Sequence, residues 1–266
     1  MQYQLGIIGC GNMAQAIASG AIKQGVIDAK QVIASDPSAE HRAVFEGWGC
    51  VTCEDNGSVA QQAQQILLAV KPQIFPKVAP QLINPPDGQV LISIMAGLSS
   101  EKIASLIGGP CRVVRVMPNT PALVGAGMAG IALGQGAEQG DDDLAKRLFD
   151  AVGEVIELDE PMIDAINAIS GSGPAYLFYL AEAMEAAAKE LGLGEHARQI
   201  VAQTLMGSGK LLAESKEDPA ELRRKVTSPG GTTLAASNHM DSRQVQPAIV
   251  EAIHAAFERA KELGAS

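Results

Sequence analysis

Hydrophobic residues in the first part of the chain gather in short runs, and the longer stretches between these runs have the spacing of helices. Most of the runs show little alternation of apolar and polar residues, which is typical of strands buried on both faces of a parallel sheet. The predicted strands cover residues 3–9, 31–35, 50–52, 65–70, 89–95 and 111–117. The stretches between them, such as residues 13–24 and 99–107, are long enough for crossover helices, so the pattern predicts right-handed βαβ units.

From residue 161 onward the pattern is that of helices alone. Residues 174–191 and 249–260 carry apolar side chains at helical spacing, and these helices are rich in alanine. They are apolar around more than one stripe, which suits burial against other helices of the chain or against a second subunit. The sequence therefore predicts an α/β domain over residues 1–160 and an all-α domain over residues 161–266.

The chain has 266 residues, of which 47% are hydrophobic, and this is enough apolar material for two modest cores. The formal net charge of −10 would repel nucleic acid and anionic membrane surfaces, so we expect neither as a partner. The longest uncharged run, residues 116–137, contains two prolines and five glycines and therefore cannot form a continuous membrane-spanning helix. Because no basic and apolar leader precedes the first predicted strand, we expect a cytoplasmic protein.

The four cysteines include the pair Cys50 and Cys53, which has the C-x-x-C spacing found in metal and redox sites. One such pair cannot supply the four ligands of a zinc site, so no metal site is predicted. The pair follows Trp48 and Gly49, where we expect a buried strand and not the helix N-terminus that would lower a thiol pKa. Ordinary packing is therefore the favoured interpretation, and redox chemistry is the alternative.

The first predicted strand ends in residues 9–14, GCGNMA, which read G-x-G-x-x-A and open a predicted helix. In a dinucleotide-binding fold Gly9 permits the tight turn, Gly11 lets the backbone approach a pyrophosphate, and Ala14 allows close helix packing. The positive end of the helix then faces the phosphates. A glycine turn without a ligand is the alternative, but the strand before the motif and the helix after it favour a Rossmann-type dinucleotide site.

Polar residues follow other predicted strands at the edge where open α/β sheets bind ligands. Asp36 would favour the free 2′-hydroxyl of NADH, whereas Ser35 and nearby backbone can bind the 2′-phosphate of NADPH. No arginine adjoins them in the sequence, and Asp36 can equally begin a turn before Pro37. Residues 69–72, AVKP, and 118–121, PNTP, follow the fourth and sixth strands and belong to the same edge.

A second glycine-rich segment, residues 226–234 with the sequence VTSPGGTTL, places Ser228 and Pro229 at a predicted helix start. Serine at the N-cap and proline at the first helical position would leave Gly230 and Gly231 in the first turn with exposed N–H groups. Each glycine costs roughly 1 kcal/mol relative to alanine inside a helix, so the pair requires a reason. An anion held at the helix N-terminus supplies one, whereas the alternative, a cap without a ligand, leaves the glycines unexplained.

Several segments together resemble the pyrroline-5-carboxylate reductases, and the resemblance extends over nearly the whole chain. They are GIIGCGNMA at 6–14, AVKPQ at 69–73, IMAGL at 94–98, RVMPNTPALVGAG at 115–127, SGSGPAYLFYLAEAM at 170–184 and VTSPGGTTLAA at 226–236. The resemblance implies a Rossmann-type dinucleotide-binding domain followed by a helical dimerisation domain, with the active site between them. It also implies a homodimer, or a larger assembly of dimers.

By the same resemblance the protein is an oxidoreductase that uses NADPH to reduce the cyclic C=N bond of 1-pyrroline-5-carboxylate, giving L-proline in the last step of proline biosynthesis. The implied cofactor positions are Gly9, Cys10, Gly11, Asn12, Met13, Ala14, Ser35, Asp36, Asn56, Ala69, Val70, Lys71, Pro72, Met95, Ala96 and Gly97. The implied substrate positions are Ser228, Gly230, Gly231, Thr232 and Thr233. Many members of the family lack an acid after the second strand, so Asp36 keeps NADH open as a cofactor.

The predicted catalytic residue is Thr233, because a hydroxyl in the first turn of this helix can hydrogen-bond the imine nitrogen. Two other functions stay open. A related reductase acting on a carbonyl would use a helical lysine, but the predicted helix after Pro174 has no lysine or histidine before Lys189. A dinucleotide sensor without turnover would have no use for a second anion site.

Overall fold

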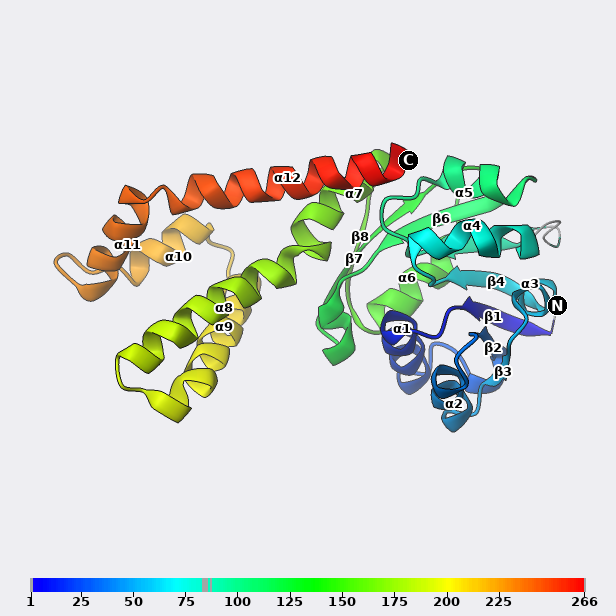
Figure 1. The fold of residues 1–266 in the computed structure, drawn as a ribbon, viewed down its shortest axis with the longest axis horizontal. Coiled ribbons are helices and arrows are strands. Elements are labelled where there is room, and N and C mark those ends of the chain that lie inside the picture. The colour runs from blue at the N-terminus through cyan, green and yellow to red at the C-terminus, as the bar shows by residue number, and fades with distance from the viewer. Residues whose placement is uncertain (1, 83–85, 87, 266) are drawn as a thin grey trace. The chain divides into compact units, whose positions relative to one another are not determined.

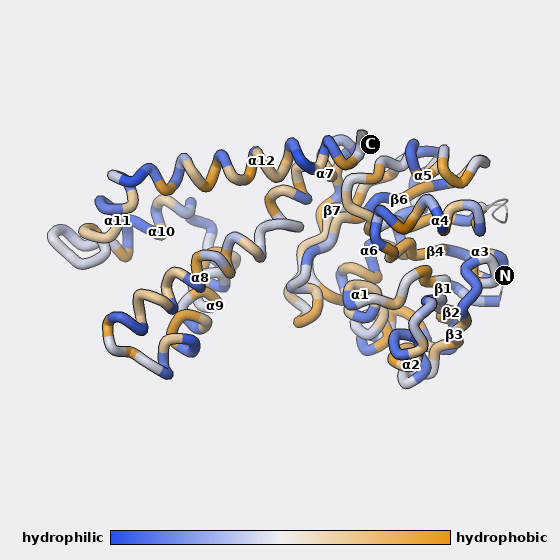
Figure 2. Tube along the Cα trace, in the orientation of Figure 1, coloured by the Kyte–Doolittle hydropathy of each residue, from blue (hydrophilic) through white to orange (hydrophobic). Residues whose placement is uncertain are grey.

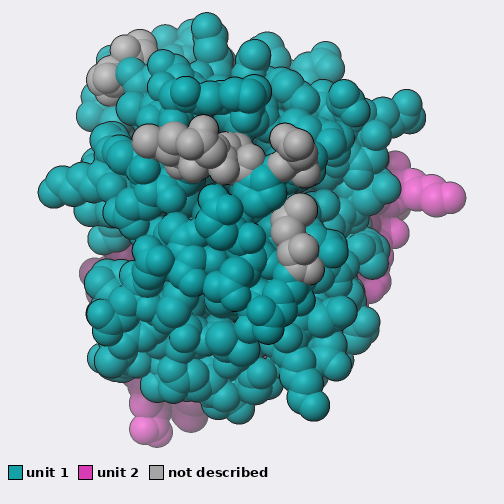
Figure 3. Space-filling view, turned by 90° about the vertical axis from the view of Figure 1, so that its right-hand side faces the viewer, with its two compact units in different colours: residues 1–172, 256–266 teal, residues 173–255 magenta. Residues whose placement is uncertain are grey.

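The computed structural model describes residues 2–82, 86 and 88–265. The chain divides into two compact units, which Figure 3 shows in different colours. One of them, here called the α/β unit, consists of residues 1–172 together with 256–266, and the other, the helical unit, consists of residues 173–255. Within the described ranges, none of the helices combines the length and the apolar character needed to span a membrane.

The α/β unit is built on an eight-stranded sheet with the strand order β3-β2-β1-β4-β5-β6-β7-β8 (Figure 1). The strands are β1 (Tyr3–Ile8), β2 (Val32–Ser35), β3 (Val51–Cys53), β4 (Ala63–Leu68), β5 (Val90–Ser93), β6 (Arg112–Met117), β7 (Gly127–Leu133) and β8 (Gly153–Glu157). Neighbouring strands from β3 through β6 are parallel, β7 is antiparallel to β6, and β8 is parallel to β7. The strand order reverses between β1 and β4, the point at which such sheets bind dinucleotides.

All six predicted strands are present, and their observed bounds lie within two residues of the predicted ones. The sequence prediction missed β7 and β8. Glycine weakens a strand signal, and β7 contains Gly127 and Gly130. A Cβ at Gly130 would lie 3.1 Å from Cγ2 of Ile166, so close packing favours glycine inside this strand.

Helices cover both faces of the sheet, as its mostly apolar strands predicted. The helices of this unit are α1 (Asn12–Lys23), α2 (Ala39–Gly47), α3 (Asn56–Gln62), α4 (Phe75–Val78), α5 (Ser100–Ile107), α6 (Asp143–Asp150) and α7 (Ile163–Ile166), and the end of α12 (Val245–Ala265) also belongs to it. The hydropathy colouring of Figure 2 shows the sheet strands as largely apolar segments.

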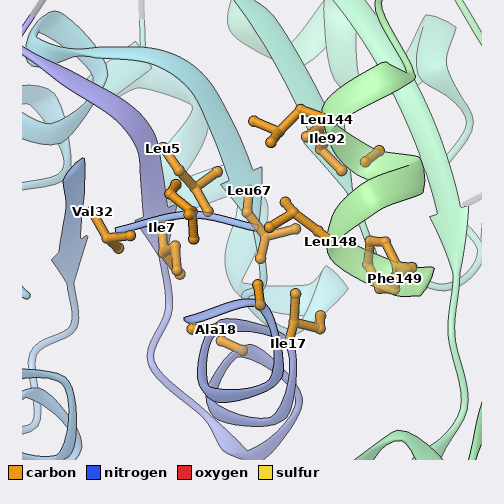
Figure 4. Packing of buried hydrophobic residues seen from close by; sticks show 14 of the residues in the cluster. Leu5, Ile7, Ile17, Ala18, Val32, Leu67, Ile92, Leu144, Leu148 and Phe149 are labelled. Atoms are coloured by element: carbon orange, nitrogen blue, oxygen red, sulfur yellow. The ribbon is translucent and has the colours of Figure 1, made fainter. Parts of the chain in front are cut away.

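Two apolar clusters make up the core, one on each face of the sheet. Leu67 of β4 belongs to the cluster that Ile17 of α1 and Leu148 of α6 complete (Figure 4). Its neighbours Ile66 and Leu68 belong to the other cluster, because successive strand residues point to opposite faces. Each fully buried side chain of this kind contributes roughly 1.5–3 kcal/mol to the stability of the fold.

The helical unit contains α8 (Gly173–Glu190), α9 (Ala197–Glu214), α10 (Pro219–Lys225), α11 (Thr232–Ser242) and the first part of α12. The prediction of an all-α second half is therefore confirmed. Helices α8 and α9 form an antiparallel hairpin (Figure 1), in which Ala188, Ala197 and Val201 are buried. The turn between them contains Gly192 and Gly194, both with positive φ, a conformation that glycine adopts without strain.

The C-x-x-C pair lies at β3, which is one of the two edge strands of the sheet as the structure describes it. The expectation of a strand at this position is confirmed, but the expectation that it is buried is wrong, because β2 is its one partner among the described strands and Val51 is 42% exposed. All four cysteines are free, and the residues that the structure describes contain no cluster able to hold a metal ion. Burial raises the pKa of Cys50 to about 11 and also raises that of Cys53, which favours packing over redox chemistry.

We expect Cys10 and Cys50 to resist alkylation at pH 8 in the folded protein. Burial, reinforced at Cys10 by the charge of Asp36, raises their pKa values to about 12 and about 11, and only the thiolate is nucleophilic. Mass spectrometry after iodoacetamide treatment should find both unmodified natively and all four cysteines modified in urea. Rapid labelling of Cys10 in the native protein would contradict the expected protection from alkylation.

The same two raised pKa values predict how stability depends on pH. Because the folded state holds these protons more tightly, the free energy of unfolding should fall as pH rises past 9.0, the ordinary thiol value.

Candidate active site

The predicted cofactor residues follow the carboxyl ends of neighbouring parallel strands. Ile8 at the end of β1 is level with Ser35 of β2 and with Leu68 of β4. Ser35 is in turn level with Cys53 of β3, and Leu68 with Ser93 of β5. The segments that come together at this edge are residues 9–14, 35–36, 56, 69–72 and 95–97. The structure thus brings all the predicted cofactor segments to one edge of the sheet.

The glycine loop is tight at its first glycine and open at its second. Gly9 has φ +96°, and a Cβ there would lie 2.9 Å from the carbonyl oxygen of Ala69 and 3.0 Å from Cγ1 of Val70. Its N–H donates to the carbonyl oxygen of Ser35 at 2.8 Å. A Cβ on Gly11, in contrast, would meet no atom of the described residues within 4 Å. Gly9 is therefore required by the fold, while the space beside Gly11 is open to a ligand.

The N-terminus of α1 lies directly after this open space. Gly11 is the N-cap and provides no side-chain acceptor, so the N–H groups of the first turn are available to an outside acceptor. Cys10 and Ala14 are buried, and Cys10 donates its S–H to the carbonyl oxygen of Ser35 at 3.6 Å. These two residues can therefore meet a ligand only through their backbone. Free N–H groups at a helix N-terminus beside an open glycine fit the pyrophosphate of a dinucleotide.

Ser35 and Asn56 are joined at the carboxyl ends of β2 and β3. The Ser35 hydroxyl, which is buried, donates to Oδ1 of Asn56 at 2.7 Å. Nδ2 of Asn56 donates in turn to Oε1 of Gln81 at 2.9 Å. The two predicted cofactor residues therefore form one hydrogen-bonded pair, although 21 positions separate them in the sequence.

The carboxylate of Asp36 accepts backbone N–H groups from two different segments of the chain. Its Oδ2 accepts the N–H of Cys10 at 2.8 Å, and its Oδ1 accepts the N–H of Ser38 at 2.8 Å. The second contact confirms that Asp36 begins a turn before Pro37, and the first fastens this turn to the glycine loop. The sequence showed no arginine beside Asp36, but α2 brings Arg42 there: its Nη1 donates to the Asp36 carbonyl oxygen at 2.6 Å.

The segments after β4 and β5 complete the edge. Lys71 is exposed at the N-cap of a short 3-10 helix, whereas Met95 is buried. Gly97 has φ +73°, and a Cβ at Gly264 would lie 2.8 Å from its carbonyl oxygen. The last turn of α12 therefore backs the 95–97 segment. Sequence reasoning missed this contact because 167 positions separate the two glycines and no local pattern links them.

The glycine-rich segment of the helical unit forms a turn before α11. The N–H of Gly231 donates to the carbonyl oxygen of Ser228 at 3.0 Å, and Gly230 has φ +69°. With Pro229 in the second position these are the features of a type II turn. The predicted helix start is therefore wrong: Gly231 is the N-cap and α11 begins at Thr232. The physical reason is that Gly230 adopts the left-handed conformation, which a helix cannot contain.

The first turn of α11 consequently carries the two threonines in place of the two glycines. The N–H groups of Thr232, Thr233 and Leu234 have no acceptor within the helix, and Gly231 supplies no side-chain cap. Thr232 is exposed and Thr233 is half-buried. The predicted substrate residues thus form a single local cluster around the N-terminus of an 11-residue helix.

Asn119 of the PNTP segment has a structural role that the sequence did not reveal. Its Nδ2 donates to the hydroxyl of Ser170 at 3.0 Å, and its Oδ1 accepts the N–H of Met128 at 2.9 Å. One amide side chain therefore fastens the end of β6 to β7 and to the SGSG segment that precedes α8.

The covered, mostly parallel sheet, the glycine loop at its switch point and the separate helical unit define a Rossmann-type dinucleotide-binding protein with a second, all-α part. Curated relatives include the pyrroline-5-carboxylate reductases of Haemophilus influenzae, 41% identical over 99% of this chain and 98% of the relative, and of Synechocystis, 39% identical over 99% of each. The chain belongs to the pyrroline-5-carboxylate reductase family.

Family models and solved structures agree with this assignment. Residues 160–263 match the model described as pyrroline-5-carboxylate reductase dimerisation, and residues 4–97 match that of the coenzyme F420-dependent NADP oxidoreductases. A pyrroline-5-carboxylate reductase structure from Coxiella burnetii has a TM-score of 0.89 and 36% identity over 99% of both chains. The Plasmodium falciparum pyrroline carboxylate reductase with NADP bound also has a TM-score of 0.89, at 29% identity over 98% of both chains.

Proposed function

We propose that this protein reduces 1-pyrroline-5-carboxylate to L-proline with NADPH, the last step of proline biosynthesis. The observation that carries the proposal is the presence, in one chain, of two prepared anion sites. One is the glycine loop at the sheet edge, and the other is the Ser228–Gly231 turn that leaves the N-terminus of α11 open. The names of the full-length relatives support the same activity.

Residues 1–160 are proposed to bind the dinucleotide, and residues 161–266 to bind the imine and to form the dimer. The start of the dimerisation match at residue 160 supports this boundary. The cofactor supplies a hydride when it is bound. The N–H groups that open α1 hold its pyrophosphate, while Lys71 and the 95–97 segment line the same edge.

In the helical unit, the first-turn N–H groups of α11 are proposed to bind the substrate carboxylate, assisted by Ser228 and the backbone of Gly230 and Gly231. The Thr233 hydroxyl then hydrogen-bonds the ring nitrogen. A protonated imine is already electrophilic, so the protein acts mainly by positioning two reactants and needs little acid catalysis.

The composition of α8 favours an imine over a carbonyl as the reacting group. A carbonyl requires a proton donor or cation that polarises it, but α8 contains no lysine or histidine before Lys189 in its last turn. Carbonyl reduction by a related enzyme therefore remains the second candidate function. A sensor that binds a dinucleotide without turnover is the third, and the open N-terminus of α11 counts against it.

The decisive measurement is NADPH oxidation, followed by absorbance, with 1-pyrroline-5-carboxylate and with a panel of 2-oxo acids. We expect oxidation only with the cyclic imine, and L-proline as the product by chromatography. Oxidation with a 2-oxo acid alone would establish the carbonyl reductase. Saturable NADPH binding without oxidation of any compound would establish the sensor.

The active form is proposed to be a homodimer, and dimers can associate further. Large apolar side chains stand exposed on α8 and α9 of the single chain: Leu177, Phe178, Tyr179, Leu180, Ile200, Met206, Leu211 and Leu212. An exposed apolar surface of this extent is typical of an interface between subunits. The four free cysteines are compatible with the reducing cytoplasm, which is the proposed location.

Replacing Leu211 by glutamate should convert the dimer into a monomer at micromolar concentration. Leu211 is 56% exposed in the single chain, and burying a carboxylate at an apolar interface costs several kcal/mol. Equilibrium sedimentation should give a monomer for Leu211→Glu and a dimer for the native chain. Gln199→Glu adds the same charge at an exposed polar position of α9 and should remain dimeric. A dimeric Leu211→Glu protein would show that this face is not the interface.

A further inference from the structure

We propose that Arg42 is the residue that selects NADPH, by binding the 2′-phosphate of the adenosine ribose. This inference rests on the proposed binding of a dinucleotide at the glycine loop. The guanidinium is held at the carboxyl end of β2, where a dinucleotide fold places that ribose. Arg42 is thereby a specificity-determining residue for the cofactor, and it lies outside the segments that the family resemblance assigned.

The side chain of Arg42 is oriented by two contacts. Nη1 donates to the carbonyl oxygen of Asp36 at 2.6 Å, and Nη2 donates to Oε1 of Glu54 at 2.8 Å. The side chain is only 14% exposed, so it is held against the protein and does not extend into solvent. A guanidinium carries five N–H donors in a planar fork that matches phosphate geometry. Contacts with described residues occupy two of these donors, and the others remain for a second oxyanion.

The aspartate after β2 does not oppose a 2′-phosphate here as it would in an NADH-specific site. Each of its carboxylate oxygens accepts a backbone N–H, from Cys10 and from Ser38, both at 2.8 Å. Nδ1 of His41 lies 3.4 Å from Oδ1, and the side chain of Asp36 is 11% exposed. The carboxylate is therefore a fixed part of the glycine loop, with its charge partly offset by the donors around it.

Ser35 is a weaker candidate for the same task. Its single hydroxyl proton is donated to Oδ1 of Asn56 at 2.7 Å, and the residue is fully buried. It can offer a phosphate no further proton without breaking that bond. Within the described part of the chain, Arg42 is thus the cation that contacts the end of β2 and retains unused donors.

Glu54 competes with a 2′-phosphate for the guanidinium of Arg42. Its carboxylate is 74% exposed, so it sits on the guanidinium as a loosely held surface partner. A 2′-phosphate carries more charge than a carboxylate and can displace it. Removing the charge of Glu54 should therefore strengthen binding of the 2′-phosphate, a gain that a purely structural role of Arg42 does not produce.

The test compares two adenine nucleotides that differ in the 2′-phosphate, using isothermal titration calorimetry on the full-length protein. Adenosine 2′,5′-bisphosphate should bind more tightly than adenosine 5′-monophosphate. Arg42→Gln should weaken binding of the bisphosphate by at least about tenfold, or 1.4 kcal/mol. The dissociation constant of the monophosphate should stay within about twofold of its native value. Arg42→Lys should be intermediate because lysine lacks the fork, and Glu54→Gln should strengthen the bisphosphate severalfold. Lys30→Gln, an equal charge change at the opposite end of β2, should alter neither nucleotide.

Each outcome decides the proposal. Equal weakening of both nucleotides by Arg42→Gln would make Arg42 a structural residue, and no change in either would place the 2′-phosphate elsewhere. If Arg42→Gln does not fold, the gain expected from Glu54→Gln decides instead, and its absence overturns the inference. These titrations contain no imine, so a protein that binds as expected but does not reduce 1-pyrroline-5-carboxylate would refute the proposed reaction and leave the role of Arg42 standing.

Discussion

Replacing Gly11 by alanine should leave the stability of the protein nearly unchanged and weaken NADPH binding by more than about tenfold. Gly11 has φ −70° and ψ 178°, a conformation open to any residue, and a Cβ there lies more than 4 Å from every atom in the part of the chain that the structure describes. The methyl group would instead fill the space proposed for the pyrophosphate. An N-cap alanine costs the fold up to about 1 kcal/mol relative to glycine, which is small beside the roughly 5–15 kcal/mol of a typical folded protein.

Gly9→Ala is the matched variant, and it should fail for a different reason. At φ +96° the alanine is strained, and its Cβ would lie 2.9 Å from the carbonyl oxygen of Ala69. Strain of this kind costs about 1–3 kcal/mol, so Gly9→Ala should lower both the melting temperature and NADPH affinity. Thermal unfolding without ligand and fluorescence titration with NADPH separate the two effects. If Gly11→Ala bound NADPH as the native protein does, the pyrophosphate would have to lie away from this glycine.

The sequence predicted the parts of the fold that depend on local pattern. Most of the strands β1 to β6 are apolar on both faces, and the order of strands and helices along the chain already implied a parallel sheet. Because carboxyl ends of parallel strands share one edge, the meeting of residues 9–14 with residues 69–72 and 95–97 followed from order alone. β7 and β8 escaped prediction because their pattern is interrupted by glycine in one case and by charge in the other.

Features that depend on contacts between residues far apart in the chain could not be predicted from the sequence. The acid at Asp36 suggests NADH when only its neighbours in sequence are considered. In the structure it accepts the N–H of Cys10, 26 positions away, and Arg42 contacts its carbonyl oxygen from α2. A side chain assigned to ligand recognition is thus also an anchor of the loop, and the cation beside it becomes visible only once α2 is folded against β2.

The start of α11 illustrates an error of a different kind. Serine followed by proline is a common helix start, so the local signal pointed to Ser228 as the N-cap. The same four residues, Ser-Pro-Gly-Gly, also satisfy a type II turn, in which proline and glycine occupy their preferred positions. The turn forms because Gly230 can adopt positive φ without strain, and it moves the helix start to Thr232. The N-terminus of α11 is still a candidate anion site, but its free N–H donors belong to the threonines and not to the glycines.

This shift has a chemical consequence for the proposed catalytic residue. Thr233 is the second residue of α11, so its own N–H is one of the free donors of the first turn and its hydroxyl lies on the same residue. A carboxylate contact persists through the reaction and contributes mostly uniform binding. A hydrogen bond to the ring nitrogen strengthens as the iminium becomes an amine, because the nitrogen lone pair appears only then. The two contacts should therefore affect different kinetic constants.

Thr233→Ala should lower kcat by about ten- to hundredfold, equivalent to about 1.4–2.7 kcal/mol of transition-state stabilisation. The KM for NADPH should change little, because the implied cofactor positions all lie in the α/β unit. Thr233→Ser keeps the hydroxyl and should retain most of the activity, while Thr233→Val keeps the shape without it and should resemble the alanine variant. Stopped-flow measurement of NADPH oxidation at saturating imine isolates the hydride-transfer step.

Thr232→Ala is the control for this experiment, since Thr232 lies in the same turn, is exposed and keeps its backbone N–H when the side chain is removed. It should raise the KM for the imine at most severalfold and leave kcat near the native value, because the backbone donors to the carboxylate are unchanged. Normal turnover by Thr233→Ala would remove the hydroxyl from the mechanism. If kcat dropped equally for Thr232→Ala and Thr233→Ala, the removal of either side chain would be disturbing the turn as a whole. The contact with the ring nitrogen is assigned to the Thr233 hydroxyl only if kcat falls for Thr233→Ala but not for Thr232→Ala, and if Thr233→Ser retains it.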